Sequence, residues 1–165
     1  MSPQAIDRND VEAAVEKAIR VLNAASQTRF GLTQKLKREG YSPSVVVAAS
    51  ARMEALGYVN DGAYADALVQ KRQRQGRGVK VIASELHHKG IDPELIDEIL
   101  AGVDAGAEVD RATELAVRLV RRHADEPTVR QREHVISGLM RRGFTPGVAR
   151  RALDRSLVDS RPLNS

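Results

Sequence analysis

The sequence contains no cysteine and no tryptophan, and its 165 residues include only three tyrosines and two phenylalanines. Without thiols there is no disulfide framework and no cysteine-based zinc site, which fits a reducing compartment. The core must therefore consist mostly of Ala, Leu, Val and Ile. The chain also lacks an apolar signal core and any uncharged apolar run of the roughly 18 residues that a membrane span needs. We expect a soluble, cytoplasmic protein with no membrane contact.

Positive charge is present but unevenly distributed. Residues 1–110 carry 14 Lys and Arg against 16 Asp and Glu, whereas residues 111–165 carry 12 Arg against 6 acids. The formal net charge of +4 therefore divides into −2 and +6. Within residues 1–110, the segment Lys71–Lys80 holds five of the bases and no acid. A cationic C-terminal third of this kind favours an anionic partner such as nucleic acid.

One turn sequence occurs three times, as LKREGYSP (Leu36–Pro43), LHHKGIDP (Leu86–Pro93) and LMRRGFTP (Leu139–Pro146). Each glycine is expected to end a helix in the left-handed conformation, and each proline to occupy the first turn of the next helix. The residue before each proline is a candidate N-cap, and the apolar residue after each glycine is expected to fill the angle between the helices rather than stack on bases. The candidate N-caps are Ser42, Asp92 and Thr145. The apolar residues are Tyr41, Ile91 and Phe144.

The glycines of these turns are 50 and 53 residues apart, which is typical of repeated helical units. Apolar residues follow each turn at helical spacing, and a further helical stretch precedes each helix pair, near 11–24, 63–75 and 108–123. The sequence thus predicts an all-α fold, an elongated array of three tandem three-helix repeats. The predicted boundaries are a disordered N-terminus (1–10), repeats at 11–57, 58–104 and 105–157, and a disordered tail (158–165).

The middle of the chain carries four short motifs in a fixed order. They are a G-Y-V-N-D step (Gly57–Asp61), the pair Tyr64-Ala65, a G-x-G step (Gly76–Gly78) that follows a basic helix, and an E-L-x-x-x-G-I turn (Glu85–Ile91). In this order they resemble the central block of the RecX family, bacterial regulators of the RecA recombinase. The resemblance extends over roughly 22–157. Val79 stands where the family often has Pro, and Gly62-Ala63 replaces a more usual charged pair.

The resemblance implies a non-enzymatic regulator that binds the RecA filament on single-stranded DNA and inhibits its recombinase, ATPase and coprotease activities. It would thereby modulate DNA repair and the SOS response, and we expect it to act as a monomer. Thirteen basic residues are candidates for contact with the nucleic acid or the filament: Lys71, Arg72, Arg74, Arg77, Lys80, Arg111, Arg118, Arg121, Arg122, Arg141, Arg142, Arg150 and Arg151. Arg111, Arg118 and Arg122 fall on one helical stripe beside apolar residues.

Catalytic and metal motifs find little support in the sequence, and we expect no cofactor and no metal. His87 and His88 are adjacent, so they point to different sides of a helix and cannot bind one metal as an i, i+4 pair could. Gly76–Gly78 lacks the remaining residues of a phosphate-binding loop and is expected to be a simple loop between helices. Asp61 has no partner carboxylate for acid–base chemistry, so we expect it to be a helix N-cap.

Two other functions remain open at this point. Three-helix units with a glycine-containing turn also describe helix-turn-helix regulators of duplex DNA. Against this class, the stretch Ser44–Ser50 holds only small and apolar residues and Glu94–Leu100 is acidic, which leaves 146–155 as a possible recognition helix. A protein-interaction scaffold without nucleic acid is the second alternative.

Overall fold

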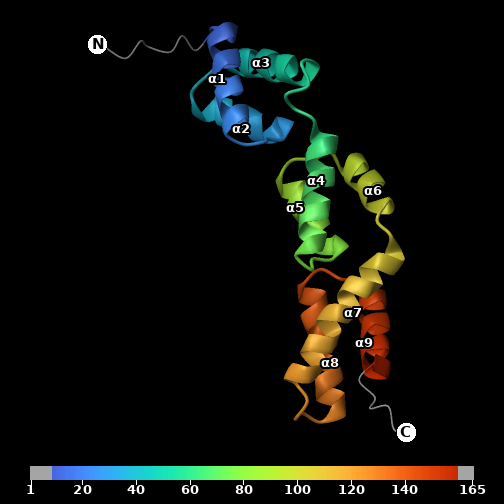
Figure 1. The fold of residues 1–165 in the computed structure, drawn as a ribbon. Coiled ribbons are helices and arrows are strands. Elements are labelled where there is room, and N and C mark those ends of the chain that lie inside the picture. Colours follow the sequence, from blue (N-terminus) through green and yellow to red (C-terminus); the bar gives the residue numbers. More distant parts are fainter. Residues whose placement is uncertain (1–8, 160–165) are drawn as a thin grey trace. The chain divides into compact units, whose positions relative to one another are not determined.

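The structure, a computed structural model, describes residues 9–159, and in this range it contains nine helices and no strand (Figure 1). The all-α fold expected from the sequence is confirmed. The helices are α1 (Val11–Ala24), α2 (Arg29–Arg38), α3 (Pro43–Ala55), α4 (Asp61–Arg74), α5 (Val79–His88), α6 (Pro93–Ala101), α7 (Ala105–Arg122), α8 (Thr128–Arg141) and α9 (Pro146–Asp159).

The segments expected to be disordered, 1–10 and 158–165, lie mostly outside the described residues. At the C-terminal side, α9 continues through Asp159, two residues into the predicted tail. Between residues 9 and 159, no helix combines the length and the apolar composition required to cross a bilayer.

The three repeated turns have the conformation that their sequence predicts. All three turn glycines have a positive φ, 91° at Gly40, 71° at Gly90 and 96° at Gly143. The apolar residue that follows each glycine is buried, with relative exposures of 6% for Tyr41, 3% for Ile91 and 1% for Phe144. Because the rings of Tyr41 and Phe144 are buried, they belong to the core and do not serve as stacking platforms for bases.

The helix caps agree with the sequence at two of the three turns. Asp92 accepts a hydrogen bond from the Glu94 amide (2.9 Å) and Thr145 from the Val148 amide (3.3 Å). Ser42 occupies the N-cap position of α3, but the prediction that its side chain caps the helix is wrong. The Ser42 hydroxyl instead lies 3.4 Å from the hydroxyl of Ser44. Pro43 reduces the number of free amides at this helix start, because proline has no amide hydrogen.

The expectation that Asp61 caps α4 is also wrong. Asn60 is the residue whose side chain accepts the Ala63 amide (2.9 Å), and α4 already begins at Asp61. The Asp61 carboxylate accepts a hydrogen bond from the amide of Arg29, the first residue of α2 (2.8 Å). In the Asn-Asp step one side chain therefore caps its own helix, and the other binds the start of a helix about thirty residues earlier.

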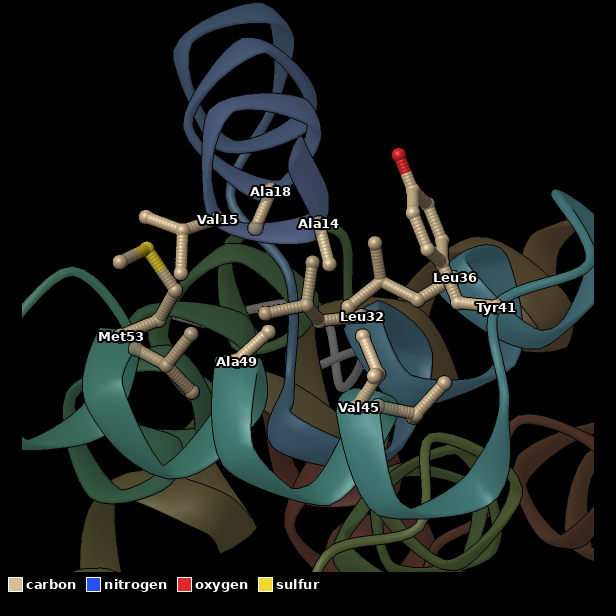
Figure 2. Close-up of a cluster of buried hydrophobic side chains, with 11 residues drawn as sticks. Ala14, Val15, Ala18, Leu32, Leu36, Tyr41, Val45, Ala49 and Met53 are labelled. Atoms are coloured by element: carbon tan, nitrogen blue, oxygen red, sulfur yellow. The ribbon is translucent and has the colours of Figure 1, made fainter. Parts of the chain in front are cut away.

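The chain divides into two compact units that each combine segments distant in sequence. Unit 1 consists of residues up to Asp66 together with Leu86–Leu95, and unit 2 consists of Ala67–Glu85 together with residues from Ile96 onward. In unit 1, α1, α2 and α3 pack around small and aliphatic side chains, including Ala18, Leu32 and Met53 (Figure 2). Tyr41 closes this core, and its hydroxyl donates a hydrogen bond to the Ala13 carbonyl (3.2 Å).

The start of α2 lies against the turn at the end of α5 within unit 1. The Thr28 hydroxyl donates to the Lys89 carbonyl (2.7 Å) and accepts the Gly31 amide (3.0 Å), so one buried side chain caps α2 and binds the turn. A Cβ placed on Gly90 would overlap Cβ and Cγ of Phe30. Glycine at this position therefore permits both the left-handed turn and the close approach of a ring.

Replacing Gly90 by valine is expected to lower the free energy of unfolding by at least about 1 kcal/mol, because a β-branched residue is strained at positive φ. The added side chain must also displace Phe30. Gly57→Val is the matched control, since Gly57 has a similar φ of 76° but no atom within 4 Å of the position that a Cβ would take. In urea unfolding followed by circular dichroism, Gly90→Val should lower the free energy of unfolding more than Gly57→Val does. An unchanged midpoint for Gly90→Val would contradict the strain.

Candidate nucleic-acid interface

Helix α7 begins at a well-formed cap and carries its arginines beside its buried face. Asp104 accepts hydrogen bonds from the amides of Gly106 (2.7 Å) and Ala107 (3.0 Å). These backbone hydrogen bonds, that of Ala107 foremost, hold the pKa of the Asp104 carboxyl below its usual range, and the charge of Arg111 acts in the same direction. The cap therefore stays anionic at the positive end of the helix. Along α7, Ala112 and Ala116 are fully buried.

The loop between α4 and α5, together with the first turn of α5, is held against the end of α8 by backbone contacts. The loop between α4 and α5 joins the turn after α8 through hydrogen bonds from the Gly78 amide to the Arg142 carbonyl (2.9 Å) and from the Lys80 amide to the Gly143 carbonyl (3.0 Å). A Cβ on Gly78 would overlap backbone atoms of Gly143 and Phe144. The close backbone approach therefore explains the second glycine of the G-x-G step.

The start of α5 is fixed to α7 in the same region. Glu108 is 6% exposed, and its carboxylate accepts the amide of Val79 (3.1 Å). A carboxylate at the start of a helix satisfies one of the free amides and favours the helix dipole. Residues 78–80 are thus attached to α7 by a side chain and to the α8 turn by the backbone.

Unit 2 also contains a cleft of about 860 Å³. Its cationic lining comes from three places: the end of α4 with its following loop, one face of α7, and the end of α8. The arginines are Arg74, Arg77, Arg111, Arg118, Arg122, Arg141 and Arg142, and within residues 9–159 the one acid in the lining is Glu114. Seven positive charges against one negative charge give the lining a formal charge of +6.

The cleft also has an apolar part, formed by Leu115, Leu119 and Gly138. A Cβ on Gly138 would lie 2.9 Å from Cδ1 of Leu119, so glycine allows α8 to approach α7 closely here. Among the described residues that line the cleft, none is aromatic. The chemistry therefore suits a phosphate backbone more than bases stacked on rings, and a contact of this type carries little sequence preference.

The seven cleft arginines differ from several other arginines of the chain in their ion pairing. Within residues 9–159, none of the seven takes part in a salt bridge, whereas Arg155 binds Asp110 at 2.8 Å and Arg132 binds Asp154 at 3.4 Å. In addition, Nε of Arg111 is buried and has no hydrogen-bond partner. Like charges gathered in one place repel one another, and a buried donor without an acceptor is costly, so both features favour an anionic ligand.

The other predicted contact residues lie elsewhere. Arg72 donates to Glu85 through Nε (2.6 Å) and a terminal nitrogen (2.5 Å), a bidentate pair that joins α4 to α5. The remaining five are exposed but do not line the cleft: Lys71, Lys80, Arg121, Arg150 and Arg151. For these six residues, contact with nucleic acid or filament stays a prediction.

Sequence reasoning did not select the lining residues other than arginine, which are Gln73, Gln75, Gly76, Glu114, Leu115, Leu119 and Gly138. The signal for Leu115 was available, since it shares the helical spacing of Arg111, Arg118 and Arg122 on α7. For Gly138 there was none, because only the packing of α8 against α7 shows why a glycine is needed inside a helix.

Comparison with known proteins places this fold and sequence in one family. The family model described as the second three-helix domain of RecX matches residues 60–100. The regulatory protein RecX of Mycobacterium avium is 35% identical over 151 residues, which cover 89% of this chain and 86% of the relative. The chain belongs to the RecX family. A RecX protein from Mycobacterium sp. (strain JLS) is 36% identical over 146 residues, 86% of this chain and 80% of the relative.

Solved RecX structures show the same all-α fold. The crystal structure of RecX from Lactobacillus salivarius aligns with a TM-score of 0.86 over 90% of this chain and 97% of the other, although only 20% of the residues are identical. A second RecX crystal structure aligns with a TM-score of 0.79 at 24% identity, over 87% of this chain and 71% of the other. A regulatory role as a RecX protein follows from the family.

Proposed function

We propose that this RecX-family chain binds the RecA filament on single-stranded DNA and inhibits its recombinase, ATPase and coprotease activities. It would thereby modulate DNA repair and the SOS response in the cytoplasm, as a monomer without enzymatic activity. The observation that carries the proposal is the cleft of unit 2, which is lined by seven arginines, none of them in a salt bridge within residues 9–159.

The physical argument begins with the phosphates. Arginine binds phosphate oxygens with paired donors, and each contact releases counterions condensed on the DNA, so a cleft with several free guanidinium groups gains affinity at low salt. The floor of Leu115 and Leu119 offers no donors or acceptors that would read base edges. Binding of this kind does not depend on the base sequence.

Unit 1 has exposed apolar side chains that suit contact with a protein. Phe30, Val47, Leu56 and Tyr58 of unit 1 are large apolar side chains with relative exposures of 47%, 62%, 59% and 53%. Exposed apolar residues are common at protein interfaces. We assign the DNA contact to the cleft of unit 2 and leave the RecA contact to other surfaces of the chain.

The deciding experiment measures the DNA-dependent ATPase of RecA on single-stranded DNA as the chain is added. Inhibition is expected, and it should weaken with rising salt because phosphate contacts contribute to binding. Binding to a labelled single strand without RecA, measured over the same salt series, tests the DNA contact alone.

Other outcomes would identify the alternatives. Tight binding to particular duplex sequences without an effect on RecA would favour a helix-turn-helix regulator. ATPase inhibition without any binding to single strands, even at low salt, would favour a protein scaffold. Truncation near Gly106 is a poor test of the cationic third, because it removes Glu108 and Arg142, which hold residues 78–79.

A further inference from the structure

The corner between α7 and α8 brings together two of the four histidines of the chain. His123 is the C-cap of α7, and the amide of Glu126 donates to its carbonyl (3.2 Å), which closes the turn. The side chain of Gln131 donates to the carbonyl of Val120 (3.0 Å) and so fixes the start of α8 to the last turn of α7. None of these contacts involves the side chains of His123, Glu126 or His134, and together they set the geometry of the corner.

Both histidine rings face one carboxylate. Nδ1 of His123 lies 2.9 Å from Oε1 of Glu126, and Nδ1 of His134 lies 2.6 Å from Oε2. The ring centroids are 4.9 Å apart with an interplanar angle of 44°. Hydrogen bonds, from His123 first and then from His134, hold the pKa of the Glu126 carboxyl below its usual range. The Glu126 carboxylate thus lies between two imidazole nitrogens.

We propose that His123, Glu126 and His134 form a binding site for a divalent transition-metal ion of the Zn²⁺ class. Each residue offers one ligand atom, and these atoms all lie within 4.8 Å of one another. Ligand atoms of a tetrahedral zinc ion are about 3.3 Å apart when the bonds are 2.0–2.1 Å long, so small side-chain rotations suffice. The side chains are 25%, 32% and 52% exposed, which leaves a fourth position open to water.

The donor set selects the class of ion. Two imidazole nitrogens and one carboxylate oxygen are the ligands of many zinc sites that keep an open position, whereas Mg²⁺ and Ca²⁺ prefer oxygen ligands throughout. The chain has no cysteine that could provide a competing thiolate. A bound ion would link the end of α7 to α8 next to Arg122, one of the cleft arginines. The site would thus stabilise the two helices that carry most of the cationic lining.

The test uses the full chain, without a histidine tag and stripped with a chelator. Titration with Zn²⁺ in a calorimeter should show one ion per chain, and saturating Zn²⁺ should raise the melting midpoint. Co²⁺ should give the intense visible absorption of a low-coordinate site with nitrogen and oxygen ligands. His123→Gln, Glu126→Gln and His134→Gln should each lower Zn²⁺ affinity by at least about tenfold, as loss of a ligand requires.

The matched control replaces the other two histidines, His87→Gln together with His88→Gln, and should retain full Zn²⁺ affinity and the shift in melting midpoint. His134 is half exposed, so His134→Gln should keep its helix content in the absence of metal. The proposal is wrong if Zn²⁺ binds the unaltered chain no more tightly than the variant that lacks both His123 and His134. Because metal affinity and melting are measured without RecA or DNA, failure here is distinct from failure of the proposed function.

Discussion

Replacing Arg118, Arg122, Arg141 and Arg142 together by glutamate is expected to weaken binding to single-stranded DNA by at least about 100-fold near 0.1 M salt. All four line the cleft, and none is in a salt bridge within residues 9–159, so the change breaks no ion pair of the fold. If each arginine contacts one phosphate, the slope of log affinity against log salt should fall by about 2.8, because each contact contributes roughly 0.7 for a single strand.

The control for this variant changes the net charge equally but outside the cleft. Arg121, Arg130, Arg150 and Arg151 are exposed residues of the same unit that do not line it. Reversing either set shifts the formal net charge from +4 by −8 to −4. If charge alone governs binding, both variants lose affinity equally. If the cleft governs it, the control keeps most of the affinity for single strands and most of the salt slope.

Equal losses in the two variants would reject the cleft as the DNA site and return the function to distributed surface charge. Circular dichroism should show the same helix content for both, since the replaced side chains do not pack in the core of α7, α8 and α9. A cleft variant that still binds single strands but fails to inhibit RecA would instead place the protein contact in the cleft.

Replacing Gly78 by alanine is expected to destabilise unit 2 by about 2 kcal/mol or more. The added methyl group would overlap backbone atoms of Gly143 and Phe144, and backbone cannot rotate aside as a flexible side chain can. Separating the two segments would also break the hydrogen bonds that link Gly78 to Arg142 and Lys80 to Gly143. The measurement is thermal or urea unfolding followed by circular dichroism.

Gly76→Ala provides the comparison, because it lies in the same loop but has open space around its side-chain position. Its φ of 69° predicts a loss of only about 1 kcal/mol. The two variants should also differ in DNA binding. Gly78→Ala moves Arg77 away from Arg142 and should weaken binding to single strands, whereas Gly76→Ala should have little effect. Equal stability of the two variants would mean that the close approach of loop and turn is not required.

Much of the local structure follows from the sequence. The turns at Gly40, Gly90 and Gly143 could be predicted because a glycine after a basic helix end, followed by a cap and a proline, has one favoured conformation. Burial of Tyr41 and Phe144 followed from their common position in the repeated turn. Capping was less predictable, since Ser42 and Asp61 are both good N-cap residues by type but make other contacts in the structure.

The sequence by itself therefore determined the helices, their turns, the family and the cationic character of the C-terminal third. Only the tertiary structure decided which cations act together, because seven of the thirteen predicted basic residues line one cleft and Arg72 binds Glu85 instead. Arg77 and Arg142 are neighbours through hydrogen bonds between backbones sixty-odd residues apart. His123 and His134 likewise meet Glu126 across a turn whose geometry depends on helix packing. Helical periodicity is local, whereas a cleft or a ligand set depends on contacts between distant segments.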